Sequence, residues 1–186
     1  MSVTLRPLAE TDVDHVMTWV NDPAVVGNFG WFTGKPITRE AELGYLGKLV
    51  AQHRDPNGAE RVYSVLDSSG PDGRYLGQVG LHQIHRPSRV GRLSIIIAAK
   101  ADHGKGYGTA AMRALVAEAF DTEKLHKVWM MFYRTNQRTR ALAHKLGFVD
   151  EGVLREEYLY QGAYHDMVRT ALLEREYRAQ PQHDRA

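Results

Sequence analysis

Residues 95–109 read IIIAAKADHGKGYGT, and this stretch decides the fold. The apolar run at 95–98 is typical of a strand that is covered on both faces. A glycine-rich segment follows it, and the apolar residues then change to helical spacing up to Phe120. The stretch therefore predicts a buried strand over 89–99, a tight turn, and an amphipathic helix from Gly106 to Phe120.

The turn between this strand and this helix predicts a site for an anion. Gly104, Gly106 and Gly108 let the backbone turn tightly and approach a ligand without a Cβ in the way. The start of the helix offers unpaired N–H groups and the positive end of its dipole. We therefore expect phosphate or pyrophosphate to bind here, with positive charge from Lys105 and His103.

The glycine spacing narrows the kind of phosphate ligand. A structural turn is the simpler reading of an isolated G-x-G, but the buried strand before it and the patterned helix after it favour a ligand site. A Walker loop would need G-x-x-x-x-G-K-[ST], and no Ser or Thr follows Lys105. A dinucleotide fingerprint would need G-x-G-x-x-G, and position 109 is Thr.

The rest of the chain predicts an α/β domain with one mixed sheet. Period-two patterns and turn residues predict strands at 3–7, 61–67, 74–85, 89–99, 127–133, 149–160 and 164–173. Helical spacing predicts further helices at 13–20, capped by Thr11, and at 38–53 and 137–146. We expect a loop at 24–37 and a polar, frayed tail after Glu176. This order of elements places helices on both faces of the sheet.

Length and composition bound the class of protein. The 186 residues favour one domain, and 25% charged residues are typical of a globular chain. The absence of cysteine excludes a disulfide scaffold, a thiolate metal site and a cysteine nucleophile. A net charge of +2, spread along the chain, argues against nucleic acid as a partner. No apolar run reaches the ~18–20 residues that span a membrane, and residues 1–12 are unlike a secretory signal, so we expect a cytoplasmic location.

Two motifs resemble the GNAT superfamily of N-acetyltransferases. The superfamily's acyl-CoA loop has the pattern Q/R-x-x-G-x-G/A, and here His103, Gly106 and Gly108 fill it, with His replacing Gln or Arg. The sequence NQRT at 136–139, followed by KLGF at 145–148, resembles the superfamily's next conserved helix. Weaker flanking features resemble the RimJ/RimL branch and the spermidine acetyltransferases.

The resemblance implies a fold and a cosubstrate. It implies one acyl-CoA N-acyltransferase domain over 1–178 with a polar tail at 179–186. It also implies a mostly antiparallel sheet with a V-shaped splay between the parallel strands at 89–99 and 127–133. Acetyl-CoA would lie in this gap. By the resemblance its contacts are Ile96, Ile97, Ala98, His103, Gly104, Lys105, Gly106, Tyr107, Gly108, Thr109, Asn136, Thr139 and Lys145. For Asn136 a plain helix N-cap is an equal alternative.

The implied reaction is direct transfer of acetyl to a primary amine, which must first lose a proton. The tyrosine that often protonates the leaving thiolate is replaced here by Ala143, and the usual glutamate stretch reads GRL at 91–93. We therefore consider His82 as the base, ahead of His85, Tyr133 and Asp166, because histidine is the commonest general base. Gln78, Gly80, His82 and Ile84 are expected on one side of their strand. Thr139 is a second catalytic candidate that could position the sulfur or a water.

The acceptor is left open by the sequence. The resemblance implies a small amine, an amino sugar or antibiotic, or a protein N-terminus. Its pocket is predicted to involve Trp19, Trp31, Phe32, Tyr158 and Asp166. The aromatic residues at 29–32 could instead pack over the sheet edge. A CoA-binding regulatory module without turnover is the alternative function. We expect no metal site and no membrane partner, and a homo-oligomer is allowed.

Overall fold

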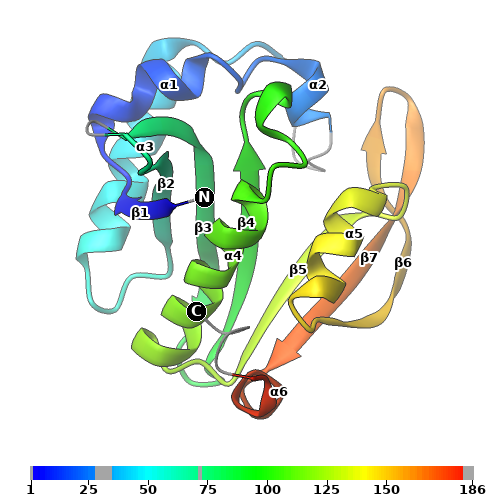
Figure 1. Cartoon of the computed structure of the whole chain (residues 1–186). Helices are drawn as coiled ribbons and strands as arrows, with labels where there is room; N and C mark the ends of the chain where they lie inside the picture. The colour runs from blue at the N-terminus through cyan, green and yellow to red at the C-terminus, as the bar shows by residue number, and fades with distance from the viewer. Residues whose placement is uncertain (1, 28–34, 71–72, 182–186) are drawn as a thin grey trace.

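The computed structural model describes residues 2–27, 35–70 and 73–181, and it shows a mixed sheet with helices on both faces (Figure 1). The strands are β1 (Val3–Pro7), β2 (Arg61–Asp67), β3 (Arg74–His85), β4 (Val90–Ile97), β5 (Lys127–Tyr133), β6 (Val149–Tyr160) and β7 (Ala163–Leu173). The α-helices are α1 (Val13–Met17), α2 (Pro23–Val26), α3 (Arg39–Arg54), α4 (Tyr107–Ala117), α5 (Gln137–Lys145) and α6 (Glu174–Ala179). The expected fold class is confirmed.

The order of strands across the sheet is β1-β2-β3-β4-β5-β7-β6. The two central strands, β4 and β5, run parallel, and the other neighbouring pairs are antiparallel. β4 pairs with β5 only from Val90↔Lys127 to Arg92↔Trp129. Beyond that point the strands diverge, as Figure 1 shows. The predicted splay is therefore present, and within the described part of the chain the β5-facing edge of β4 has no strand partner from Leu93 to Ile97.

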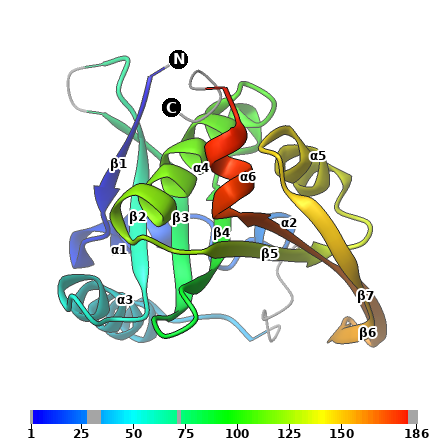
Figure 2. The same ribbon diagram turned by 90° about the horizontal axis from the view of Figure 1, so that it is seen from below.

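Helices lie on both faces of the sheet, as Figure 2 shows. An apolar core lies on each face. The larger core lies under α4, α5 and α6, and it includes Phe120, Leu115 and Met112, which are fully buried. The second core lies under α1, α2 and α3 and is centred on Val16 and Leu46. Burial of these side chains supplies the main driving force for folding. The sheet is thus held from both sides while its middle is open at the splay.

The start of the chain differs from the expected long helix. α1 ends at Met17, and its N-cap is Asp12 rather than Thr11. Pro23 does not end a helix but begins α2, where the Asp22 side chain accepts a hydrogen bond from the Ala24 N–H at 2.8 Å. Proline suits the first helical position because its missing N–H has no helical partner there. The loop expected from residue 24 therefore starts later.

The end of the chain is also more ordered than predicted. Instead of a frayed tail after Glu176, α6 continues to Ala179. Tyr177 is buried and stacks on Phe120, with ring centroids 4.8 Å apart. Its hydroxyl donates to Asp121 at 2.9 Å. This aromatic anchor docks the helix on the core, and Arg178 and Gln180 add hydrogen bonds to the Phe120 and Leu146 carbonyl oxygens.

Strand β3 contains an irregularity that the period-two pattern hides. Gln83 has φ +52°, and the pairing with β4 shifts between His82 and His85. Ile84 consequently packs in the larger core instead of sharing a side with His82, which corrects the expected alternation.

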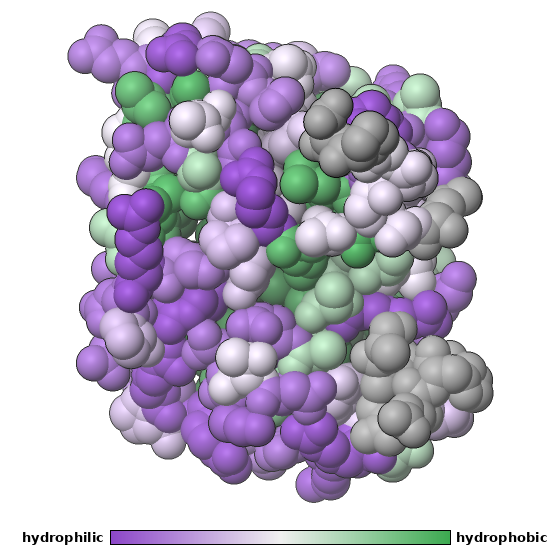
Figure 3. Space-filling model, turned by 60° about the vertical axis from the view of Figure 1, so that its left-hand side comes forward, coloured by the Kyte–Doolittle hydropathy of each residue, from purple (hydrophilic) through white to green (hydrophobic). Residues whose placement is uncertain are grey.

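Hydrophilic side chains dominate the face shown in Figure 3, where apolar ones gather near the centre of the view. Among residues 2–27, 35–70 and 73–181, no helix is long and apolar enough to cross a membrane.

Candidate active site

A cavity of about 730 Å³ follows the splay between β4 and β5. Residues 92–97 of β4 and 130–132 of β5 form its walls. The glycine turn and the first turn of α4 lie around it, together with part of α5. Ala24 and Val25 of α2 and Tyr158 of β6 also border it. The cavity thus connects an anion-binding helix start with side chains from the other face of the sheet.

The glycine turn has the backbone geometry that the sequence predicts. Gly104 has φ +78° and Gly106 has φ +90°, in the left-handed region that favours glycine. The Ala110 N–H makes a helical bond back to the Gly106 carbonyl, so the amides of residues 107–109 precede the first such bond. A Cβ on Gly108 would lie 3.4 Å from Ile95 Cδ1, so glycine here lets α4 pack closely on β4.

His103 lines the cavity, but both ring nitrogens have protein partners. Nε2 donates to the Ile97 carbonyl oxygen at 2.8 Å, and Nδ1 accepts from the Arg138 guanidinium at 2.7 Å. The imidazole therefore ties the end of β4 to α5. Arg138 also lines the cavity, and sequence reasoning missed it as a source of positive charge; its place inside the NQRT motif was the available signal.

Three residues of α5 and its start also lie where they were expected to meet a coenzyme. Asn136, Thr139 and Lys145 all line the cavity. The Asn136 side chain accepts from the Thr139 N–H at 3.1 Å, so it caps α5 as well as bordering the cavity. Ile96, Ile97, Gly104, Gly106, Gly108 and Thr109 complete the set of expected contacts that border it.

Three other expected contacts lie outside the described lining of the cavity. The Ala98 N–H bonds to the Leu76 carbonyl at 2.9 Å, and its side chain packs in the second core. Lys105 pairs with Asp102 at 3.4 Å. The Tyr107 side chain is buried in the larger core, and its hydroxyl donates to Asp67 at 2.7 Å.

The structure does not bring the residues expected to bind the acceptor together at one pocket. Tyr158 borders the cavity. Trp19 is a core residue instead, 6% exposed, and its Nε1 donates to the Tyr75 hydroxyl at 3.2 Å. Asp166 holds the β6–β7 hairpin by accepting from the Glu156 N–H at 3.0 Å, so its side chain is already engaged. Trp31 and Phe32 lie outside the described residues.

Charge along the described lining is mainly positive. Arg92, Arg138 and Lys145 border the cavity, and burial lowers the pKa of Arg92 against the opposing effect of Glu60. The carboxylate among the described lining residues is Asp102, and the Arg74 guanidinium donates hydrogen bonds to it at 2.7 and 3.0 Å. Hydrogen bonds from Arg74 hold the pKa of Asp102 below its usual value. The described cavity therefore suits an anionic ligand.

The proposed base, His82, is near the cavity without lining it. Its Nε2 lies 2.8 Å from Ser94 Oγ, and Ser94 does line the cavity. Its Nδ1 bonds to the Glu60 carboxylate. Sequence reasoning missed Ser94 and Glu60, since serine and glutamate are common and no motif marks these two. Ala143, at the position of the usual tyrosine, is fully buried.

A splayed parallel pair, an anion-binding helix start and a cavity that joins them define an acyltransferase that binds coenzyme A. Residues 2–149 match the family model described as Acetyltransferase (GNAT) domain. The chain therefore belongs to the GNAT acetyltransferase family, and its cosubstrate is acetyl-CoA.

Relatives and solved structures agree with this family. The Bacillus subtilis protein named "Putative ribosomal N-acetyltransferase YdaF" is 34% identical over 180 residues, covering 94% of this chain and 93% of the relative. A spermidine N(1)-acetyltransferase of Escherichia coli K12 is 28% identical, covering 96% and 90%. The crystal structure of Vibrio cholerae spermidine N-acetyltransferase with CoA and spermine has a TM-score of 0.81 at 27% identity, covering 94% of this chain and 97% of that one.

Proposed function

We propose that this acetyltransferase acts on a primary amine whose molecule carries little other positive charge, such as a protein N-terminus or a small monoamine. The observation that carries the proposal is the charge of the described cavity lining. Arg92 is a cation on the β4 wall, beside Ser94, and Asp102 is already held by Arg74. Arg138 and Lys145 add two further cations to the described lining, and Glu60 offsets part of the charge of Arg92. A polyamine or an aminoglycoside would therefore gain no uncommitted carboxylate from the described lining.

The coenzyme is proposed to lie along the splay. Its pyrophosphate would accept hydrogen bonds from the amides at the start of α4, where the helix dipole adds to the attraction. Arg138 and Lys145 would face its other phosphate oxygens. The pantetheine arm would bond to the unpaired edge of β4 between Leu93 and Ile97, which no strand covers. The acetyl group would then reach the part of the cavity near Ser94 and Tyr158.

The reaction needs a neutral amine beside the thioester carbonyl. The neutral nitrogen attacks the carbonyl carbon, and the C–S bond breaks to release CoA. An N–H group on the free edge of β4 would stabilise the negative charge on the carbonyl oxygen. Thr139 remains a candidate for positioning the sulfur, because it lines the cavity on the α5 side.

Release of free thiol from acetyl-CoA, measured against a panel of amines, tests the proposal. We expect a peptide with a free N-terminus and a small monoamine to be used with a higher kcat/KM than spermidine or an aminoglycoside. A kcat/KM for spermidine above that of every monoamine would refute the proposed acceptor class. Coenzyme binding without thiol release on any amine would instead support a regulatory module.

Self-association stays a prediction. Exposed apolar side chains are concentrated on β6 and β7, namely Val149, Val153, Leu154, Leu159 and Tyr164. Light scattering coupled to size exclusion measures the mass directly, and a mass of one 21.0 kDa chain at high concentration would exclude a homo-oligomer.

A further inference from the structure

Three side chains form a hydrogen-bonded chain that ends at the cavity. Ser94, on β4, lines the cavity two residues beyond the last β4–β5 pair at Arg92. His82, on β3, places Nε2 2.8 Å from Ser94 Oγ. The other ring nitrogen bonds to the Glu60 carboxylate, at the end of the α3–β2 loop. The His82 and Glu60 side chains are 13% and 22% exposed, so they are largely sheltered from water.

The imidazole reaches Ser94 because the residue between them has no side chain. Gly80 is the partner of Ser94 across the β3–β4 ladder. A Cβ built on Gly80 would lie 2.2 Å from His82 Nε2, a distance that no real contact allows. The ring therefore lies in the space that any other residue at position 80 would fill.

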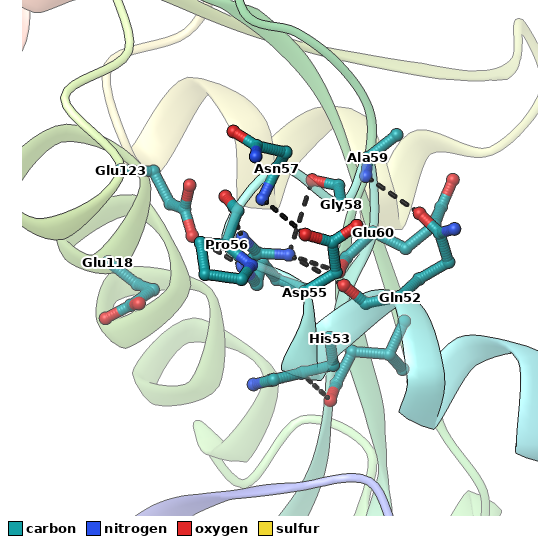
Figure 4. Close-up of polar contacts among 12 residues, drawn as sticks. Gln52, His53, Asp55, Pro56, Asn57, Gly58, Ala59, Glu60, Glu118 and Glu123 are labelled. Carbon is teal, nitrogen blue, oxygen red and sulfur yellow. Dashed lines mark hydrogen bonds and ion pairs between the residues drawn. The ribbon is translucent and has the colours of Figure 1, made fainter.

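Glu60 is held in place by its surroundings. The Gln83 N–H donates to its second oxygen at 3.3 Å, at the bulge of β3. Next to it, Arg61 donates to the carbonyl oxygens of Gln52, Pro56, Gly58 and Glu60 itself, at 2.9–3.3 Å. Figure 4 shows this loop, with Asp55 to Glu60 folded closely together beside Gln52. Arg61 also binds Glu123 at 2.6 Å, which anchors the loop to the segment that follows α4, before β5.

The charges around His82 fix which nitrogen carries the proton. Burial alone would raise the pKa of Glu60. The hydrogen bond from His82 and the nearby positive charges have the larger combined effect, so the pKa of Glu60 is lowered and its side chain is a carboxylate. A carboxylate accepts only, so Nδ1 of His82 carries the hydrogen and Nε2 is free to accept from the Ser94 hydroxyl. Of the neighbouring groups, Arg92 on β4 favours the carboxylate further, and Tyr45 on α3 is neutral because its pKa lies above the ordinary value for tyrosine.

We propose that Glu60, His82 and Ser94 form the proton relay that deprotonates the acceptor amine, an inference that rests on the proposed transfer of acetyl to an amine. The acceptor ammonium gives a proton to Ser94 Oγ while the Ser94 hydroxyl gives its own to His82 Nε2. The products are a neutral amine and an imidazolium paired with Glu60. After the nitrogen attacks the thioester, its second proton passes to the departing sulfur, and His82 returns its proton to solvent. Ser94 is the group that meets the substrate, and His82 and Glu60 act through it.

The first test replaces His82→Gln, because glutamine keeps hydrogen bonds to both neighbours and cannot take up the proton. We expect kcat/KM for the amine to fall by about 10²–10⁴-fold. The affinity for acetyl-CoA should change by less than about twofold, since the relay lies apart from the glycine turn.

His85→Gln is the matched control, because His85 lies on the same strand, is exposed and does not line the cavity. It should behave as the wild type. Two further variants separate the relay from a structural role. Gly80→Ala should displace the ring and reduce kcat/KM with coenzyme binding intact. Ser94→Ala should do the same, while Ser94→Thr, which keeps the hydroxyl, should retain most of the rate.

The relay is overturned if H82Q keeps the wild-type kcat/KM for the amine while binding acetyl-CoA. It is also overturned if mass spectrometry after mixing with acetyl-CoA alone finds acetyl on Ser94, because Ser94 would then be a nucleophile. A wild type that releases no thiol with any amine is a different result, since that refutes the proposed function itself.

Discussion

The substitution Gly104→Ala tests the central feature of the site, the glycine turn at the start of α4. Gly104 has φ +78°, lines the cavity, and has no protein atom within 4 Å of an added Cβ. A left-handed alanine costs about 1–2 kcal/mol, which for a chain of this size lowers Tm by about 2–8 °C. The new methyl group would also stand at the surface that should receive the pyrophosphate. Loss of one hydrogen bond to a charged group costs about 1.5–3 kcal/mol, so Kd for acetyl-CoA should rise about 10- to 150-fold.

A thermal shift assay resolves the two effects. At acetyl-CoA equal to 100 times the wild-type Kd, the wild type gains about 2.7 kcal/mol, or about 5–11 °C in Tm. The variant at the same concentration should gain about 0.3–1.4 kcal/mol. Gly162→Ala is the matched control, because Gly162 also has φ +78° and open space but lies in the β6–β7 turn. It should lose the same stability and keep the full gain from acetyl-CoA. A full gain in G104A would refute the placement of the pyrophosphate.

Four further substitutions address other parts of the molecule. Arg92→Gln should raise kcat/KM for spermidine relative to a monoamine by about tenfold, because it removes a cation from the cavity; an unchanged ratio would exclude this electrostatic selection. Trp19→Phe should cost about 1–3 kcal/mol of folding free energy in denaturant titrations but leave the acceptor KM unchanged, whereas a large KM effect would restore Trp19 to the pocket. Arg61→Met should lower the free energy of unfolding by about 3–5 kcal/mol, because it breaks a buried ion pair with Glu123; an unaltered Tm would contradict that role. Asp67→Asn should flatten the loss of Tm as pH falls from about 4 to about 2. Hydrogen bonds from the Ser69 hydroxyl, Tyr107 and the Ser69 N–H hold the pKa of Asp67 at about 2. The ionised Asp67 therefore contributes its full stabilisation above pH 3.8, its ordinary pKa, and this stabilisation is lost as the pH falls through about 2.

The strands could be predicted because they depend on local patterns, whereas the cavity walls were expected from the resemblance to a family. Period-two alternation located β2, β3, β5 and β6 at their exact bounds, and the spacing of glycines located the start of α4 within one residue. Segments whose structure depends on distant contacts were harder. The tail was expected to fray because its composition is polar, and the burial of Tyr177 against Phe120 is a tertiary contact that composition does not report.

Dependence on contacts between residues distant in the sequence also limited the prediction of the candidate site. His82 could be singled out because histidine is a common base, but its partners come from a loop 22 residues before it and a strand 12 residues after it. Trp19 and Tyr107 were expected at ligands from the resemblance to a family, while the structure uses both side chains for packing and hydrogen bonds inside the protein. Residue type alone does not say toward which side of the sheet a side chain points.

The contacts of Arg61 bear on how this protein can be redesigned. Four of its acceptors are main-chain oxygens, which every residue type supplies. Gly58 is the exception that must stay, because a Cβ there would lie 2.0 Å from the Gln52 carbonyl oxygen. Asn57 and Ala59 can therefore be randomised in a library while the Arg61 guanidinium holds the path of the chain; Asp55 stays, because its side chain accepts from the Asn57 N–H at 2.9 Å. Such a library offers a way to vary the surroundings of Glu60 without moving its carboxylate.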